Sequence, residues 1–174
     1  MAGAGEMEDL LRGALRGVAV ARVPTGEVPE PYHGLLCHEH DMTSTLSRYH
    51  GGEVALRVFS EEGGEETYQR EVLLTVGEKA VEYGVIRIFL ENFPGELRAE
   101  ICRGKQPLGA LLNASGLGYF SRPLAFLRIR SEDFQPDFFP ASDSKFLFGR
   151  YNQLIGSGNF VLARIIEILP NEAP

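Results

Sequence analysis

The sequence predicts an α+β fold built on an antiparallel sheet. Short segments with alternating apolar and polar residues follow one another and are joined by turn residues. Helical patterns are grouped near the start and in the middle of the chain, whereas a parallel sheet would need a helix between successive strands. The chain has 174 residues and no internal repeat. At roughly 150 residues per domain, we expect residues 1–174 to form a single domain.

The composition is that of a folded, acidic protein. Hydrophobic residues make up 44% of the chain, and 24 acidic against 17 basic side chains give a formal net charge of −7. This apolar content is enough to offset chain entropy, which excludes disorder as the default. Because an acidic chain lacks the basic excess that attracts phosphates or acidic lipids, we expect no nucleic-acid partner and no membrane partner.

Cysteine content and the lack of long apolar stretches predict a cytoplasmic location. The two cysteines, Cys37 and Cys102, are too few for a disulfide-stapled secreted scaffold. Residues 1–16 lack the basic start and apolar run of a secretion signal, and no apolar stretch approaches the roughly 18 residues of a membrane span. We expect a soluble protein and, with no large exposed apolar pattern, a monomer.

The N-terminal segment 1–33 is expected to contain a helix and a connector. Apolar residues spaced three and four apart predict an amphipathic helix over 6–16, and Gly17 follows where such helices often end. Prolines and a glycine between residues 24 and 31 then predict an extended connector, because proline disfavours regular structure there.

A second helix is expected over residues 42–50. Asp41 can cap its first turn, and Met42 and Leu46 lie on one face at helical spacing. Two glycines at 51–52 provide the stop signal. The apolar residues just before the cap predict a strand that leads into this helix.

Strand patterns dominate from residue 53 onward. Alternation over the first three segments, with a glycine turn at 63–64, predicts an antiparallel meander. Two helices follow, the second starting at a proline, and the loop 131–144 separates the later strands. The expected strands are 54–58, 67–76, 80–91, 124–130, 145–154 and 160–169, and the expected helices are 94–103 and 107–113.

Arg70 lies on an otherwise apolar strand face. Because side chains alternate along a strand, it shares that face with Tyr68, Val72, Leu74 and Val76. Burying a guanidinium without a partner costs several kcal/mol, so an acid elsewhere in the protein or an anionic ligand is expected to pair with it. The alternative is a position near the strand end with the charged group in solvent.

Glu167 is an acidic residue on an otherwise apolar face of the last strand. Its face is otherwise aliphatic, with Val161, Ala163, Ile165 and Leu169. Apolar surroundings disfavour the ionised carboxyl unless a cation is near, which would suit acid chemistry or binding of a ligand hydroxyl. The alternative is a structural ion pair with Arg70 or Arg150.

Two polar clusters match common motifs poorly. His38 and His40 stand beside acidic residues, but no third ligand follows at a recognised spacing, so we expect no metal and a polar strand-to-helix junction. Segment 104–109 mixes glycine and lysine without the spacing of a P-loop. It is either a simple turn or a helix start whose free amides bind a carboxylate.

Five short segments, taken in order, resemble the chorismate lyase (chorismate pyruvate-lyase) family. They are Asp41-Met42-Thr43, Tyr68-Gln69-Arg70-Glu71-Val72, Pro107-Leu108-Gly109, Phe148-Gly149-Arg150 and Glu167-Ile168-Leu169-Pro170. None is diagnostic alone, but together they span most of the chain after the connector. Segments 81–84 and 149–152 are most similar to the shorter bacterial branch of the family.

The resemblance implies an antiparallel sheet of about six strands, with helices packed over one face and a ligand enclosed between them. Members of the family convert chorismate to 4-hydroxybenzoate and pyruvate by an elimination that needs no metal or organic cofactor. The chain is therefore predicted to be a carbon–oxygen lyase without cofactors, acting on chorismate for ubiquinone or secondary metabolism.

The resemblance also implies a set of site residues. Arg70 would hold the ring carboxylate of chorismate and Glu167 would contact its ether-oxygen end, as the two catalytic residues. At two positions where the family often has basic residues this chain has Val85 and Ala110, so Arg87 or Arg150 would hold the second carboxylate. The predicted substrate-binding residues are Met42, Thr43, Leu108, Gly109, Arg87 and Arg150.

Two other functions use the same fold. One is a ligand-sensing domain of a bacterial transcription regulator, which binds small anions and catalyses nothing. The other is a related enzyme that makes a different aromatic product. Regulators carry a winged helix ahead of the sensor, and only about 40 residues precede Met42, close to the ~40 below which a domain rarely folds unaided. The sequence therefore favours the lyase.

Overall fold

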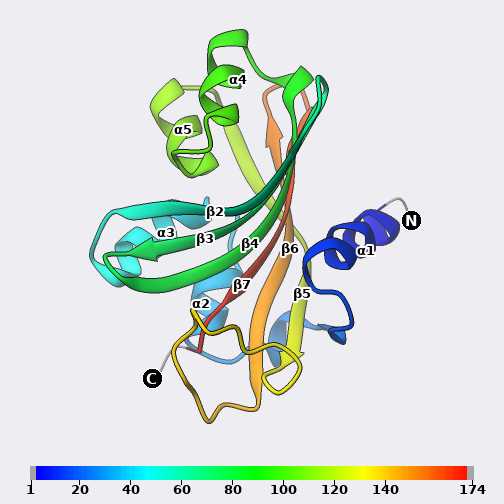
Figure 1. Ribbon diagram of the computed structural model, residues 1–174, viewed down its shortest axis with the longest axis vertical. Helices are drawn as coiled ribbons and strands as arrows, with labels where there is room; N and C mark the ends of the chain where they lie inside the picture. The colour runs from blue at the N-terminus through cyan, green and yellow to red at the C-terminus, as the bar shows by residue number, and fades with distance from the viewer. Residues whose placement is uncertain (1–2, 172–174) are drawn as a thin grey trace.

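A single antiparallel sheet forms the centre of the molecule in the computed structural model, which describes residues 3–171 (Figure 1). Within these residues the sheet has seven strands in the order β1-β5-β6-β7-β4-β3-β2. Every neighbouring pair is antiparallel. The predicted α+β class with an antiparallel sheet is confirmed.

The strands lie where the alternating segments predict them, with one addition, and the strands predicted at 54–58 and 124–130 are longer than expected. The bounds are β1 (Val20–Val23), β2 (Val54–Gly63), β3 (Thr67–Val76), β4 (Lys79–Phe89), β5 (Tyr119–Arg130), β6 (Phe146–Gly156) and β7 (Val161–Leu169). Strand β1 was not predicted; it pairs with the edge of β5, from Val20 opposite Ile129 to Val23 opposite Phe126. Four residues beside a proline carry too short an alternation to be recognised from sequence.

The helices are short and mostly well marked in the sequence. They are α1 (Gly3–Ala14), α2 (Tyr32–Leu36), α3 (Met42–His50), α4 (Gly95–Cys102) and α5 (Leu108–Ser115), with 3₁₀ turns η1 (Thr25–Glu27) and η2 (Leu90–Asn92). The Asp41 carboxylate accepts a hydrogen bond of 2.7 Å from the Ser44 amide, and Gly51 ends α3 with a φ of 71°. Asp41 and Gly51 therefore define α3 as predicted.

The strand predicted just before Asp41 is wrong. Residues 32–36 form helix α2 instead, so residues 37–41 join two helices. The predicted extended connector likewise contains the turn η1. At α2 the apolar segment is too short for its period to separate strand from helix, whereas the three residues of η1 are compatible with a connector of prolines and glycine.

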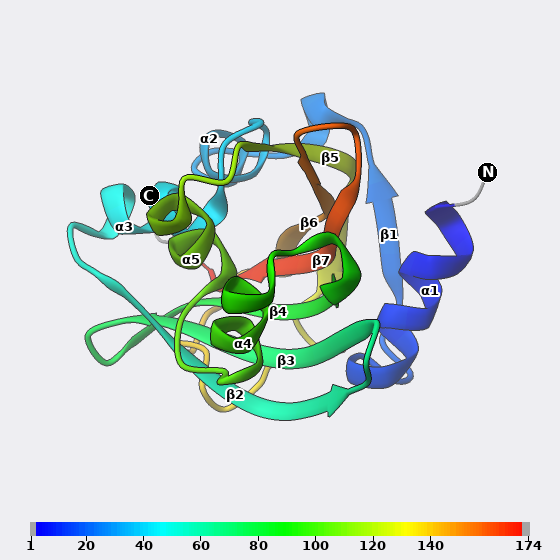
Figure 2. The ribbon, with the colours of Figure 1, turned by 90° about the horizontal axis from the view of Figure 1, so that it is seen from above.

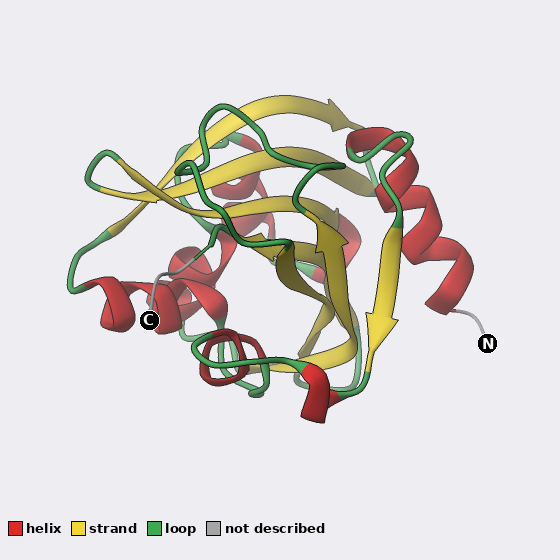
Figure 3. Ribbon diagram, turned by 90° about the horizontal axis from the view of Figure 1, so that it is seen from below, coloured by secondary structure: helices red, strands yellow, loops and turns green. Residues whose placement is uncertain are grey.

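The curved sheet has helices on both faces (Figures 2 and 3). Helices α2 to α5 cover the inner face, and α1 packs on the outer face, where Met7 and Leu10 join a core with Tyr83. The loop 131–144 adds aromatic cover to the outer face, with Phe134 5.3 Å from the Tyr83 ring between centroids. Among the described residues, no helix is long and apolar enough to cross a bilayer.

The register of the sheet places four charged residues on the inner face. Arg70 lies opposite Ile86, and Leu74 lies opposite Glu82. Glu167 lies opposite both Gly84 on β4 and Arg150 on β6. Because cross-strand partners point to the same side of a sheet, Arg70, Glu82, Arg150 and Glu167 all face the helical layer.

Gly149 lets strands β6 and β7 approach where Arg150 and Glu167 meet. A Cβ atom at Gly149 would overlap the backbone carbonyl oxygen of Glu167. Backbone moves less readily than a side chain, so we expect Gly149→Ala to lower the free energy of unfolding by about 1–3 kcal/mol, as overpacking does. Urea denaturation measures this. Gly95→Ala is the control, since a Cβ at Gly95 meets nothing within 4 Å; equal effects of the two substitutions would contradict the prediction.

Candidate functional site

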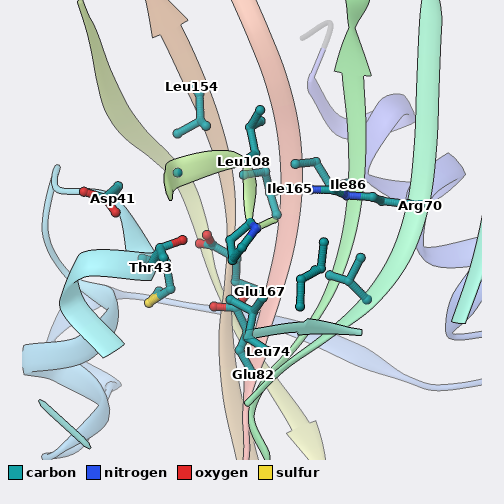
Figure 4. A pocket seen from close by; sticks show the side chains of 15 residues that line it. Asp41, Thr43, Arg70, Leu74, Glu82, Ile86, Leu108, Leu154, Ile165 and Glu167 are labelled. Carbon is teal, nitrogen blue, oxygen red and sulfur yellow. The ribbon is translucent and has the colours of Figure 1, made fainter. Parts of the chain in front are cut away.

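A cavity of about 50 Å³ lies between the inner face of the sheet and the starts of α3 and α5 (Figure 4). At ~10–15 Å³ for each water, it has room for roughly four waters, which suits a small ligand. Most of the lining is apolar. The lining residues are Asp41, Met42, Thr43, Leu56, Arg70, Val72, Leu74, Glu82, Ile86, Pro107, Leu108, Gly109, Leu154, Ile165 and Glu167.

Arg70 provides a buried positive charge with unused hydrogen-bond donors. The residue is 2% exposed, so the interpretation that its charged group lies in solvent is wrong. Its Nη2 atom donates to the carbonyl oxygen of Gln106 at 3.3 Å, whereas Nε and Nη1 are buried without a partner. Burial lowers its pKa from the ordinary value, and the Tyr68 side chain opposes this shift. Arg70 forms no ion pair within the described part of the chain.

The first turn of α5 adds free amide groups at the same cavity. Pro107 precedes Leu108 without a side-chain cap, so the first amides of the helix have no partner within the helix. Gly109 permits close contact with α3, because a Cβ there would lie 2.8 Å from Oγ1 of Thr43. Leu108, Gly109, Met42 and Thr43 thus all line the cavity, where the resemblance placed them.

Glu167 is held in a buried ion pair with Arg150. The two residues are 3% and 0% exposed. Arg150 donates through Nε to Oε2 of Glu167 and through Nη1 to the carbonyl oxygens of Leu36 and His38, both at 3.1 Å. Glu167 therefore forms the structural ion pair that was one of its two interpretations, and the partner of Glu167 is Arg150 rather than Arg70. The carboxyl group still lines the cavity.

Glu82 is a second acid in the cavity, and the sequence analysis missed it. It is 4% exposed, and its Oε2 atom is buried without a hydrogen-bond partner. Burial raises its pKa well above the ordinary value, the nearby Glu167 raises it further, and Arg150 opposes the shift. Figure 4 shows Glu82 and Glu167 together and Arg70 apart from them. Alternation along β4 could have revealed it, because Glu82 shares a face with Gly84 and Ile86.

The two candidates for a second carboxylate site do not line the cavity. Arg87 lies opposite Gln69 in the register, and its Nε and Nη2 atoms donate to Oε1 of Gln69 at 3.1 and 3.0 Å. Its position in β4 alternates with Ile86, so it faces the outer side of the sheet. Arg150 is occupied by Glu167. Arg70 is therefore the one cation among the described lining residues.

The histidine cluster lies between α2 and α3 rather than at a strand end. Nε2 of His38 lies 2.7 Å from the carbonyl oxygen of Leu35, and the His38 ring stacks on His40 with centroids 5.7 Å apart. Burial lowers the pKa of His38, and Arg150 lowers it further. Within residues 3–171, no group of three His, Cys, Asp or Glu side chains is arranged to hold a metal ion.

A larger surface depression, about 770 Å³, lies between α4 and the end of α5. Its charged side chains are solvent-exposed, and Glu100 pairs there with Arg103. It lacks the buried polar atoms without partners that mark the smaller cavity. Buried, unsatisfied charge is the stronger indication of a ligand site, so the smaller cavity is the candidate.

Comparisons with known proteins identify the fold. No family model and no curated protein matches the chain. The crystal structure of PhnF from Mycobacterium smegmatis matches at 11% identity with a TM-score of 0.53, covering 75% of this chain and 64% of that one. Its effector domain, solved separately, matches at 12% with a TM-score of 0.52, covering 76% and 89%. A GntR-family transcriptional regulator from Bacillus cereus matches at 14% with a TM-score of 0.47, covering 71% and 95%.

These matches show that the fold is the chorismate lyase-like fold of the PhnF effector domain. The prediction that the chain is a carbon–oxygen lyase is wrong, because the structures that share its fold are effector domains and no relative supports the lyase. The site agrees with this correction. Chorismate carries two carboxylates, whereas Arg70 is the one cation among the described lining residues, and Arg150 already holds Glu167.

Glu82 predicts a specific dependence of stability on pH. Its pKa is raised in the folded state, so its contribution to stability is complete below the ordinary value of 4.5 and is lost as pH rises through the folded-state pKa. We expect wild type to lose stability relative to Glu82→Gln between pH 5 and pH 8, by at most about 1.4 kcal/mol per pH unit. Urea denaturation across this range measures the difference. Glu65→Gln, an exposed carboxyl, is the control; a Glu82→Gln curve parallel to wild type would contradict the prediction.

Proposed function

We propose that this chain is a non-catalytic binding module that takes up a small organic carboxylate in the cavity. The observation that carries the proposal is the buried Arg70, with two N–H groups that face no acceptor. An unpaired buried charge is destabilising, and a ligand carboxylate would relieve it through charge-assisted hydrogen bonds. The free amides at the start of α5 would add donors from the other side of the cavity.

The rest of the cavity suits the body of such a ligand. Leu108, Ile86 and Ile165 line the same cavity, and they offer apolar contact to a hydrocarbon or ring. Sites for small molecules are usually of this kind, mostly apolar with a few placed polar groups. One lining cation matches one anionic group on the ligand.

The likeness to the PhnF effector domain supports a sensing role over catalysis. Two features of the site point the same way. Glu167 is fixed by Arg150, so its carboxylate is not free to give a proton to a leaving group. The position of Arg87 leaves no second cation to orient a dianionic substrate. By this proposal the ligand binds, stabilises the closed arrangement of α3 and α5, and leaves unchanged.

Arg70 is expected to determine carboxylate binding. Replacing it with glutamine removes charge-assisted hydrogen bonds worth about 1.5–3 kcal/mol, so the affinity for short linear carboxylic acids and their ω-substituted forms should fall about 10- to 100-fold. Isothermal titration calorimetry measures the affinity, and thermal unfolding verifies the fold. Arg87→Gln is the matched control, because Arg87 faces the outer side of the sheet, and it should bind as wild type does.

Two results would overturn the proposed function. One is the absence of Arg70-dependent binding for every acid in the series. The other is release of pyruvate when the purified protein is incubated with chorismate, since a binding module returns its ligand unchanged. Wild-type affinity in the Arg70→Gln variant would also count against it, because the carboxylate would then be bound elsewhere.

A further inference from the structure

We propose that the ligand is a zwitterion, with its carboxylate on Arg70 and a primary ammonium group held between Glu82 and Glu167. This inference rests on the proposed function and adds the second polar end of the ligand. It assigns Glu82 a role in recognition. The matching class of ligand is a small ω-amino acid with an apolar middle.

The register brings the two acids together. Gly84 lies opposite Glu167 across strands β4 and β7, and Glu82 is two residues before Gly84 on the same face. Glycine at position 84 leaves room for the acid: a Cβ there would lie 3.3 Å from Oε1 of Glu82. Both carboxyl groups line the cavity, and Figure 4 shows them together on the side away from Arg70.

Two carboxyl groups in this place share one cation. Arg150 on β6 is bound to Glu167, and no other cation lines the cavity near them within the described residues. The elements packed over Glu82 offer it Leu56 from β2, Leu74 from β3 and Met42 from α3, all apolar. Two neighbouring buried carboxyl groups disfavour each other's ionised form, so Glu82 holds its proton more strongly in the empty cavity than in water. The raised pKa of Glu82 agrees with this arrangement.

An ammonium group satisfies this end of the cavity better than a neutral group does. It carries three donors, and Oε2 of Glu82 is a buried acceptor without a partner. With the ammonium in place Glu82 ionises and its proton passes to the solvent. The buried charges then fall into pairs: Arg70 with the ligand carboxylate, the ammonium with Glu82, and Arg150 with Glu167. A ligand hydroxyl would leave Glu82 protonated and gain only neutral hydrogen bonds, which are weaker.

The test uses matched linear acids that differ only at the far end. Hexanoate, 6-hydroxyhexanoate and 6-aminohexanoate form one set. The corresponding four- and five-carbon acids form two further sets, which vary the distance between the two ends of the ligand. Titration calorimetry on the full chain gives each affinity. One charge-assisted ammonium–carboxylate contact corresponds to about tenfold or more in affinity, so the best amino acid should exceed its plain and hydroxylated counterparts by that factor.

Proton release provides a second, independent readout. Titrations at pH 7 in buffers of different ionisation enthalpy should show proton release when the amino acids bind, and none for the plain or hydroxylated acids. In Glu82→Gln the release should disappear and the preference for the amine should fall below about threefold, because one charge-assisted contact is lost. Affinity for the plain acid should persist in Glu82→Gln and fall about 10- to 100-fold in Arg70→Gln.

The zwitterion is overturned if the hydroxy acid binds as tightly as the amino acid at every length, or if wild type releases no proton. Either result leaves Arg70-dependent binding of plain acids intact, so it differs from failure of the proposed function, in which no acid binds. If thermal unfolding shows that Glu82→Gln does not fold, the amine preference and the proton release of wild type are sufficient to test the proposed zwitterionic ligand.

Discussion

The buried ion pair of Arg150 and Glu167 determines the rest of the cavity. Arg150 joins β6 to β7 through Glu167 and joins the sheet to the α2–α3 junction through the carbonyl oxygens of Leu36 and His38. The same contacts place the start of α3 over the sheet. Arg150 is bound to Glu167 through Nε, so Glu82 shares this cation with Glu167 and forms no hydrogen bond through Oε2, whereas Arg70 has no acid partner among the described residues. Removing Arg150 would leave a buried acid unpaired and loosen the helical cover at once.

The cavity contains two buried charged or acidic side chains with polar atoms that lack partners. Arg70 is buried with donors that reach no acceptor, and Oε2 of Glu82 is an acceptor that reaches no donor. A fold that only needed stability would favour apolar residues of similar size at both positions. A ligand that pairs with both groups returns this free energy on binding and stabilises the closed form. Because α3 and α5 close the cavity, such a ligand would couple its binding to the positions of these two helices.

Local signals in the sequence were sufficient for some elements and not for others. Helix α3 was predicted because Asp41 and Gly51 mark its ends chemically. Strand β1 and helix α2 were missed because four or five residues do not establish a period. The alternation rule that identified Glu167 applies equally to Glu82, but whether a strand face is inside or outside depends on its partners. Arg87 was placed in the site by the resemblance, and the register shows that it faces outward.

The resemblance to chorismate lyase identified the fold correctly and the activity wrongly, and the physical reason lies in the charges rather than the backbone. The fold supplies a curved sheet, two covering helices and an enclosed space, and these suit catalysis and binding equally. A second cation would balance the second charge of a dianion, and an unpaired acid could protonate the leaving oxygen. In this chain Val85 and Ala110 occupy positions where a cation could have been, and the acid of the last strand is held by Arg150. The cavity therefore has one cation among its described lining residues and an acid that is already paired with Arg150.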